Sequence, residues 1–373
     1  MSATASELLA VLAELDREQP RPLALATLVA VRGSSYRRPG ARLLVRDDGT
    51  TVGNLTGGCL DAEIVEAARA VDESGVAKVV TFDLTGEEEA ILGWGMGCNG
   101  VLDILVEPAV PARNASRVVA EAVLARRRTA VLTVITGDPA AVGERWWQVE
   151  SGELIGPTGN QPTTVTASAA RNALAVDRTG VVTIPSEMGE VQAFVEVLQP
   201  PPRLVVCGAG VDAVPVTRRA ADLGWDVVVV DDRRFVLNAD RFPPGTELVR
   251  TGPDAAQELP VDGNTYVVVM SHNFLRDREY LGAALGTDAR YIGVLGPRQR
   301  LQRLLDNLGR DGVLLAAHDG ARLHGPAGLD LGAQGPDEIA ISIVAEVLAA
   351  SRGRSSQYPM SRTYGAVSAE PAA

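Results

Sequence analysis

Three consecutive prolines at residues 200–202 constrain the fold more than any other feature of this sequence. A run of prolines cannot continue a helix or a central strand, and it forms a short, stiff spacer. A chain of 373 residues also favours two domains over one. We therefore predict an N-terminal domain at 1–198, a Pro-rich linker at 199–203, a second domain at 204–350, and a polar tail at 351–373 that we expect to be disordered.

The second half alternates short apolar strands with helical segments. The expected strands are RLVVCG, DVVVVD, TELVR, TYVVVMS and YIGVLG, and a last helix is expected at 337–349. Short, continuous apolar runs are typical of parallel strands that are buried on both faces. This pattern predicts an α/β fold in which a doubly wound parallel sheet, of the Rossmann-like kind, forms the C-terminal domain.

The first half mixes strands with helices and becomes rich in strands toward its end. It begins with an amphipathic helix and continues with a strand at 23–31 and a hairpin, RLLVRDDGTTVGN, that turns at Asp47-Asp48-Gly49. Helices are expected at about 60–72 and 114–127, between further strands. These elements predict an α+β domain, and no internal repeat is apparent in the sequence.

Composition excludes several classes of function. Lys78 is the single lysine, so a Walker-type phosphate loop and a Tyr-x-x-x-Lys reductase pair are both excluded. A net charge of -12 argues against nucleic-acid binding. No apolar run approaches the roughly 18–20 residues needed for membrane insertion. Three cysteines and no signal-peptide pattern lead us to expect a cytoplasmic protein with reduced thiols.

The first strand of the second half runs into a glycine turn, CGAGVDA at 207–213, that fits the dinucleotide pattern G-x-G-x-x-A. Gly208 permits the tight turn, Gly210 lets a phosphate approach the backbone, and Ala213 takes the third position of the pattern. A turn of this kind also occurs as scaffold without a dinucleotide. Cys207, just before the turn, is expected to be a small core residue.

Polar residues at the ends of later strands extend this candidate nucleotide site. Asp231 ends the next strand and is expected to accept hydrogen bonds from a ribose. Arg233 and Arg234 would instead favour a phosphorylated ribose, so NAD, NADP and another nucleotide or phosphate all remain open. His272 follows the fourth strand, where it is a candidate general base or phosphate contact, or an ordinary turn residue.

A second glycine turn, GNLTGGCLDAEI, places a cysteine at the start of an expected helix. Free N–H groups at a helix start bind anions and stabilise a thiolate, and Asp61 in the first turn suits the helix dipole. Gly57, Gly58, Cys59 and Asp61 are therefore a candidate site for a phosphate, a soft metal or a transferable sulfur. The alternative is a buried cysteine in a close-packed turn.

Another cysteine, Cys98, lies in the glycine-rich stretch GWGMGCNG. It could share a pocket with Cys59, although spacing alone does not show this. The two cysteines form no C-x-x-C pair, and no further ligands stand at the spacing of a structural zinc site.

Together these stretches resemble one family, the xanthine dehydrogenase accessory factors, also called the XdhC/CoxI family. The matching stretches are GSSYRRPGARLLV, GNLTGGCLDAEI, GMGCNGVLDILVEP, PPPRLVVCGAG, DVVVVDDR, SHN, YIGVLG and GPAGLDLGAQGPDEIAISIVAEVL. They run through nearly the whole chain in one order, which makes the resemblance more specific than any single motif.

The resemblance implies a maturation factor for molybdenum hydroxylases such as xanthine or carbon monoxide dehydrogenase. Such a factor binds the molybdenum cofactor (molybdopterin), supports its sulfuration and inserts it into the apo-enzyme. The implied partners are the apo molybdenum hydroxylase and a cysteine desulfurase, and a homodimer is compatible with this role. On this pattern Cys59, in its Gly-Gly-Cys motif, contacts molybdenum or carries sulfur, with Gly57, Gly58, Asp61 and Cys98 around the cofactor.

Three positions depart from the family pattern: Asp61 stands where glutamate is usual, Asn99 where glycine is common, and Pro297 where serine is typical. The proline removes a hydroxyl and an N–H from the turn after the fifth strand, which weakens a phosphate site there.

Two other functions stay open beside a chaperone without turnover of its own. One is an NAD(P)-dependent oxidoreductase, for which His272 is the one acid–base candidate; the other is a nucleotide-regulated adaptor for the molybdenum enzyme.

Overall fold

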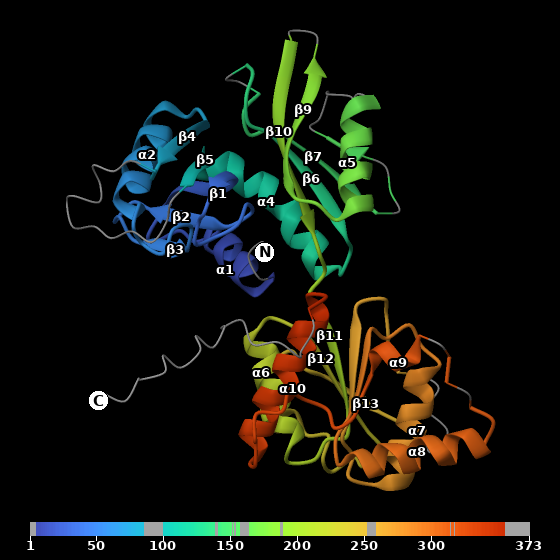
Figure 1. Cartoon of the computed structure of the whole chain (residues 1–373). Helices are drawn as coiled ribbons and strands as arrows, with labels where there is room; N and C mark the ends of the chain where they lie inside the picture. The colour runs from blue at the N-terminus through green and yellow to red at the C-terminus, as the bar shows by residue number, and fades with distance from the viewer. Residues whose placement is uncertain are drawn as a thin grey trace, which may run out of the picture. The chain divides into compact units, whose positions relative to one another are not determined.

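The structure of the chain is a computed structural model, which describes residues 5–85, 100–138, 141–150, 152, 154–156, 164–186, 189–251, 259–313, 315–316 and 318–354. The chain divides into an N-terminal unit, Met1–Pro201, and a C-terminal unit, Pro202–Ala373, so the division falls within the proline run. The predicted fold class is confirmed, because the C-terminal unit contains a parallel sheet and the N-terminal unit contains antiparallel sheets and helices (Figure 1).

The C-terminal unit is a six-stranded sheet with the order β13-β12-β11-β14-β15-β16, in which every neighbouring pair is parallel. Its strands are β11 (Arg203–Cys207), β12 (Asp226–Asp231), β13 (Glu247–Arg250), β14 (Thr265–Val269), β15 (Tyr291–Val294) and β16 (Leu323–His324). The five longer strands are those that the sequence predicts. The order reverses between β11 and β14, which is where doubly wound sheets bind ligands at their carboxyl edge.

Helices cover both faces of this sheet (Figure 1). Their bounds are α6 (Ala213–Asp222), α7 (Phe274–Leu285), α8 (Arg298–Arg310), α9 (Asp319–Arg322) and α10 (Pro336–Ser351), with a short 3-10 turn, η1 (Ala239–Arg241). Leu204 and Val206 of β11 pack into the core under α6 and α10. Val205 and Cys207 pack into the core under α7 and α8. Cys207 is fully buried, as expected, and burial raises the pKa of its thiol.

The N-terminal unit contains two antiparallel five-stranded sheets. The first has the order β3-β2-β1-β5-β4 and the second β8-β7-β6-β10-β9. The first comprises β1 (Pro22–Gly33), β2 (Arg42–Arg46), β3 (Thr51–Gly53), β4 (Lys78–Asp83) and β5 (Gly100–Pro108). The second comprises β6 (Thr129–Val134), β7 (Arg145–Val149), β8 (Leu154–Ile155), β9 (Gly180–Ser186) and β10 (Gly189–Leu198).

Each of these sheets packs one helix on one face. Helix α2 (Asp61–Ser74) buries Ile64, Ala68 and Val71 against the first sheet. Helix α5 (Thr164–Val176) packs against the second sheet in the same way (Figure 1). Helices α1 (Ala5–Glu14) and α4 (Ala109–Leu124) form a further core with apolar residues of both sheets.

The two halves of the N-terminal unit therefore share one topology. The order β1-β2-β3-α2-β4-β5 is followed by β6-β7-β8-α5-β9-β10, and the strands take equivalent places in the two sheets. We name residues 22–108 the first repeat and residues 129–198 the second repeat. The expectation of no internal repeat is therefore wrong at the level of structure. The sequence does not show the repeat, because few identical residues survive in the two copies.

Two helices differ from their expected positions. Helix α4 begins at Ala109 rather than at residue 114. Pro111 is tolerated in its first turn, because the N–H group that a proline lacks would have no partner within the helix there. Helix α5 was not expected from the sequence. Its buried side chains include Ala170 and Ala173, and alanines give little apolar contrast in a periodicity pattern.

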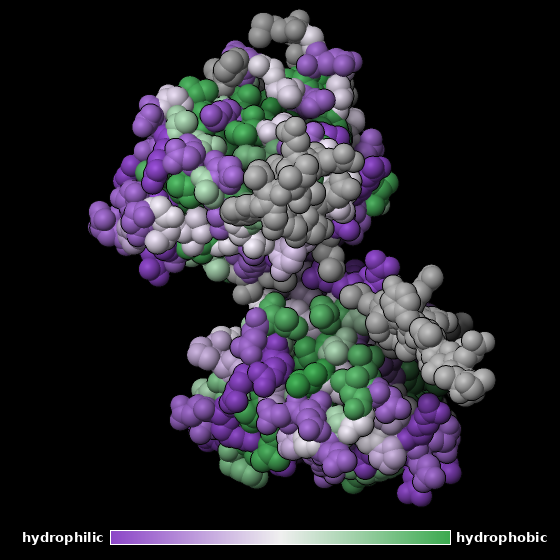
Figure 2. All heavy atoms as spheres, turned by 60° about the vertical axis from the view of Figure 1, so that its left-hand side comes forward, coloured by the Kyte–Doolittle hydropathy of each residue, from purple (hydrophilic) through white to green (hydrophobic). Residues whose placement is uncertain are grey.

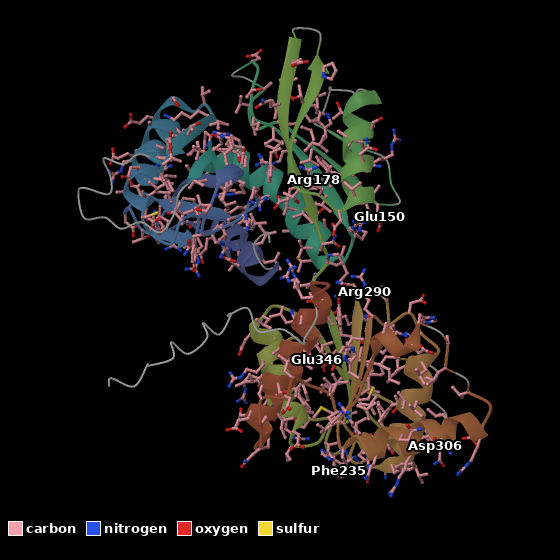
Figure 3. All side chains as sticks on the ribbon, in the orientation of Figure 1. Glu150, Arg178, Phe235, Arg290, Asp306 and Glu346 are labelled. Carbon is pink, nitrogen blue, oxygen red and sulfur yellow. The ribbon has the colours of Figure 1, made fainter. Side chains whose placement is uncertain are left out.

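Apolar residues show between hydrophilic ones on the visible face of each unit (Figure 2). Among the helices that the structure describes, none is both long enough and apolar enough to cross a bilayer. In the C-terminal unit Phe235, after β12, is 79% exposed and lies at the margin of the unit (Figure 3).

Candidate functional site

The Gly-Gly-Cys turn connects β3 to the start of α2. Gly57 and Gly58 have φ angles of 76° and 102°, in the left-handed region that favours glycine. A Cβ on Gly58 would meet no atom within 4 Å, so the backbone at this position is open on that side. The two glycines thus keep the turn both tightly curved and accessible.

The Cys59 side chain is half-buried at this turn. Its Sγ lies 3.3 Å from the carbonyl oxygen of Thr56, to which the thiol donates, and the Thr56 hydroxyl accepts the N–H of Leu60 at 3.3 Å. Leu60, the N-cap of α2, provides no side-chain hydrogen bond to the helix start. Asp61 is the first helical residue, one position after the expected start at about residue 60, and it lies in the first turn of the helix as the sequence predicts.

Several loops of the first repeat lie at the same end of its sheet. Gly53 at the end of β3 pairs with Leu43, and Gly33 at the end of β1 pairs with Gly100 at the start of β5. The segment between β4 and β5 therefore leaves and re-enters the sheet at the end where β3 leads into the turn. Cys98 belongs to this segment but lies outside the described residues, so its expected proximity to Cys59 stays a prediction.

Tyr36 is a candidate site residue that the sequence analysis does not single out. Its ring lies over the backbone of Gly57, where an added Cβ would stand 3.7 Å from Cδ1. The Tyr36 side chain is nevertheless 65% exposed. An exposed aromatic ring beside a glycine turn offers a stacking surface for a planar ligand; its place in GSSYRRPG, between glycines, is the one sequence signal for it.

No cluster that would hold a metal ion is formed by the protein's own His, Cys, Asp and Glu side chains in the described part of the chain. In this part of the chain Cys59 therefore does not belong to a group of three or more such side chains. A soft metal bound at this thiol would have to bring most of its ligands with it.

The second candidate site is the glycine turn after β11. Gly208 has a φ of 119°, and a Cβ there would lie 2.6 Å from the Cα of Ser271, so no other residue fits without a shift. Gly210 lies beside the His272 ring: a Cβ added to Gly210 would stand 3.7 Å from Cδ2 of His272. Ala213 begins α6 and is fully buried.

Asp231, the expected ribose acceptor, is buried and already fully hydrogen-bonded. One of its oxygens accepts the backbone N–H and the Nε–H of Arg233, both at 2.9 Å; the other accepts the N–H of Ala209 at 2.7 Å and Nη2 of Arg233 at 2.8 Å. Burial alone would raise the pKa of Asp231, but these hydrogen bonds outweigh it, and the net pKa is lowered. Because a carboxylate has about four acceptor sites, a ribose would have to displace Arg233.

Two further side chains shape this turn. Arg241 donates to the carbonyl oxygens of Ala209 at 2.9 Å and Gly210 at 3.2 Å, a role that its sequence position does not reveal. An open hollow of about 430 Å³, lined in part by Arg241 and Arg218, adjoins the turn. His272 has a φ of 59°, is 55% exposed, and places Nε2 2.9 Å from Oδ2 of Asp212.

Comparison with known proteins identifies both units. The family description "XdhC and CoxI family" matches residues 16–83, and "XdhC Rossmann domain" matches residues 204–347. The chain is 28% identical to a probable xanthine dehydrogenase subunit of Bacillus subtilis, over 89% of this chain and 94% of that protein. It is 25% identical to the molybdenum cofactor insertion chaperone PaoD of Escherichia coli over 87% of this chain and 81% of PaoD.

A solved structure agrees with these matches. A crystal structure described as a xanthine dehydrogenase from Bacillus halodurans is 31% identical, with a TM-score of 0.76, and the match covers 96% of this chain and 98% of that one. The resemblance seen in the sequence is therefore confirmed, and the chain belongs to the XdhC and CoxI family.

Proposed function

We propose that this protein is a molybdenum cofactor chaperone that binds the cofactor and assists its sulfuration and insertion into a molybdenum hydroxylase such as xanthine or carbon monoxide dehydrogenase. The observation that carries the proposal is the half-buried thiol of Cys59 in an open Gly-Gly turn beside the exposed Tyr36 ring. The names of the B. subtilis and E. coli relatives support it.

The residues of the turn fit the chemistry of this cofactor, which supplies a soft molybdenum centre and a planar pterin when bound. A thiolate is a suitable ligand for a soft metal and a suitable carrier of sulfur. The glycine turn leaves room at Gly58, and Tyr36 can stack on a flat ring. We assign cofactor contact to Gly57, Gly58, Cys59 and Asp61, with Cys98 as a further contact from the adjoining segment.

In the C-terminal unit we propose that Gly208, Gly210 and Ala213 receive an anionic group, either of a nucleotide or of the pterin, with His272 and Arg233 nearby. The hydrogen bonds that Asp231 already accepts leave little capacity for a ribose diol at that carboxylate. This weakens the case for an oxidoreductase that holds NAD through Asp231, and a nucleotide-regulated adaptor is the second candidate. The partner enzyme and a cysteine desulfurase as sulfur donor belong to the proposal.

Cofactor retention tests this function directly. The protein is purified from cells that make molybdenum cofactor, and molybdenum is measured by elemental analysis and pterin by fluorescence after oxidation. We expect molybdenum and pterin in the wild type. Cys59→Ala, which lacks the proposed thiol ligand, should retain about tenfold less of both. The control Cys207→Ala, which removes a buried thiol elsewhere, should retain as much as the wild type. Absence of molybdenum and pterin from the wild type would overturn the proposal, and equal retention in Cys59→Ala would remove Cys59 from it.

A further inference from the structure

Two buried ion pairs join the two repeats of the N-terminal unit. Arg42 of β2 binds Glu196 of β10 through two hydrogen bonds, Nη2–Oε2 at 2.6 Å and Nη1–Oε1 at 3.1 Å. Arg145 of β7 binds Glu107 of β5 in the same way, at 2.6 and 2.8 Å. The pairs are reciprocal, because each repeat contributes the arginine of one pair and the glutamate of the other.

The surroundings of the two arginines match closely. Arg42 also donates to the carbonyl oxygen of Gly40 at 2.9 Å, and Arg145 donates to that of Gly143 at 3.2 Å. The side chains of the first pair are 6% and 3% exposed, and those of the second are 9% and 2% exposed. Such reciprocity is the pattern that a two-fold relation between two copies of a module produces.

The first ion pair is connected to the Gly-Gly-Cys turn through the backbone. The carbonyl oxygen of Arg42 accepts the N–H of Asn54 at 3.1 Å, and Oδ1 of Asn54 accepts the N–H of Gly57 at 2.8 Å. A Cβ on Gly53 would lie 2.3 Å from the same carbonyl oxygen, so any larger residue at this position would clash with the backbone of Arg42. Glu196, Arg42, Asn54 and Gly57 thus form a continuous series of contacts.

The sequence of the second repeat cannot provide the same backbone connection for the second ion pair. The strand pairs Leu44–Val52 and Trp147–Ile155 relate the repeats by an offset of 103 residues, and α2 and α5 begin at the same offset. At that offset Pro157 corresponds to Asn54, and Asn-Gln-Pro at 160–162 corresponds to Gly-Gly-Cys. A proline has no N–H to donate to the carbonyl of Arg145, and no thiol stands at the equivalent positions of the sequence.

We propose that Glu196 of the second repeat is a positioning residue, which holds the Gly-Gly-Cys turn of the first repeat in place through Arg42 and Asn54. The second repeat has no cofactor thiol of its own and supplies the carboxylate that orders the site of its neighbour. Both cysteines of the unit, Cys59 and Cys98, belong to the first repeat in the sequence. This inference rests on the proposed role of Cys59.

The reciprocal pair provides a matched control. Glu196→Gln and Glu107→Gln each leave a buried arginine without its charged partner and should lower the melting temperature by similar amounts. Hydrogen–deuterium exchange of the full-length protein is measured on peptides that cover residues 53–60. We expect exchange there to be about tenfold faster in Glu196→Gln and within about twofold of wild type in Glu107→Gln, because the first loosens the turn locally. Iodoacetamide labelling of Cys59, followed by mass spectrometry, should rise in parallel.

Milder variants keep the test decisive if a buried substitution prevents folding. Arg42→Lys and Arg145→Lys retain the charge but lose the two-point geometry, and they are compared in the same way. Asn54→Ala should speed exchange at 57–60 without lowering the melting temperature much. Equal exchange in the two members of a matched pair, or unchanged exchange in Asn54→Ala, would overturn the inference. None of these measurements uses the cofactor, so their failure is distinct from failure of the proposed function.

Discussion

Arg42 and Glu196, 154 positions apart in the sequence, form a two-point ion pair in the interior of the N-terminal unit. Its counterpart, Arg145 with Glu107, lies close enough that the charge of Glu196 also acts on Arg145. Burial lowers the pKa of Arg145, but the charge and hydrogen bonds of Glu107 outweigh this effect and raise it overall. The guanidinium therefore remains charged, and it needs its carboxylate partner.

Removal of one partner of either pair should be strongly destabilising. We expect Glu196→Gln and Glu107→Gln each to lower the free energy of unfolding by about 3–5 kcal/mol, because an unpaired charge stays buried. Replacement of both members, as in Arg42→Met with Glu196→Leu, should restore much of this loss. Urea unfolding measures the three values. A double variant that is less stable than Glu196→Gln would contradict the explanation.

Tyr36 should contribute to cofactor retention through its ring and not through its hydroxyl. We expect Tyr36→Ala to lose about fivefold to tenfold of the retained pterin, which corresponds to about 1–1.4 kcal/mol of stacking energy. Tyr36→Phe should behave like the wild type. Because the side chain is 65% exposed, neither change should alter the melting temperature. If Tyr36→Phe loses as much pterin as Tyr36→Ala, stacking is not the interaction.

Arg233 should act as a block against ribose at Asp231. In Arg233→Ala the carboxylate loses two side-chain donors and keeps the backbone N–H groups of Ala209 and residue 233. We expect this variant to bind NADH at least about tenfold more tightly than the wild type, because ribose hydroxyls can replace the lost donors. Fluorescence titration with NADH measures the change. Asp231→Asn in the same background is the control and should lose the gain.

Glu346 should make the C-terminal unit sensitive to acid. It lies on α10 (Figure 3), and its carboxylate accepts the Tyr291 hydroxyl at 2.5 Å and the N–H of Gly328 at 2.7 Å, with Nδ1 of His324 at 3.1 Å. Burial alone would raise the pKa of Glu346, but the hydrogen bonds from His324 and Tyr291 outweigh it, so the net pKa is below the ordinary value of 4.5. A lowered folded-state pKa stabilises the fold above the unfolded pKa, and this contribution is lost as pH falls through the folded value.

The corresponding variant is Glu346→Gln. At pH 7 we expect it to lose about 1.5–3 kcal/mol of unfolding free energy, the usual value of hydrogen bonds to a charged group. Below about pH 4 the difference from wild type should shrink, because the wild-type carboxylate is then increasingly protonated. Urea unfolding at the two pH values measures this difference. An equal loss at both would show that the charge of Glu346 is not responsible.

The sequence was sufficient for the features that depend on neighbours along the chain. Four of the five longer parallel strands were predictable because each contains a short apolar run, whereas β13 has only Leu248 and Val249 between charged residues. Gly208 was identifiable because a strand leads directly into its turn. The start of α2 was predictable to within one residue from the pattern after Gly-Gly-Cys. Helix α5 was not, because two of its buried side chains are alanines, which stand out little from their neighbours.

The duplication was harder to recognise because its signal is distributed. The triplet Val-Val-Thr recurs at 79–81 and 181–183. Each repeat also contains one arginine and one glutamate of the two buried ion pairs. Insertions of different length separate these matches, so a fixed sequence period does not align them. The equivalent strand order and the reciprocal ion pairs made the repeat evident.

By itself, the sequence determined the local elements, the glycine turns and the presence of a thiol at a helix start, since apolar periodicity and backbone freedom act over a few residues. Only the tertiary structure decided which partners the charged groups have. It paired Asp231 with Arg233 and Ala209, and Glu196 with Arg42, because contacts between distant residues depend on how the sheets pack. The same packing brought the Tyr36 ring beside Gly57, a contact that the position of Tyr36 between two glycines in the sequence does not specify.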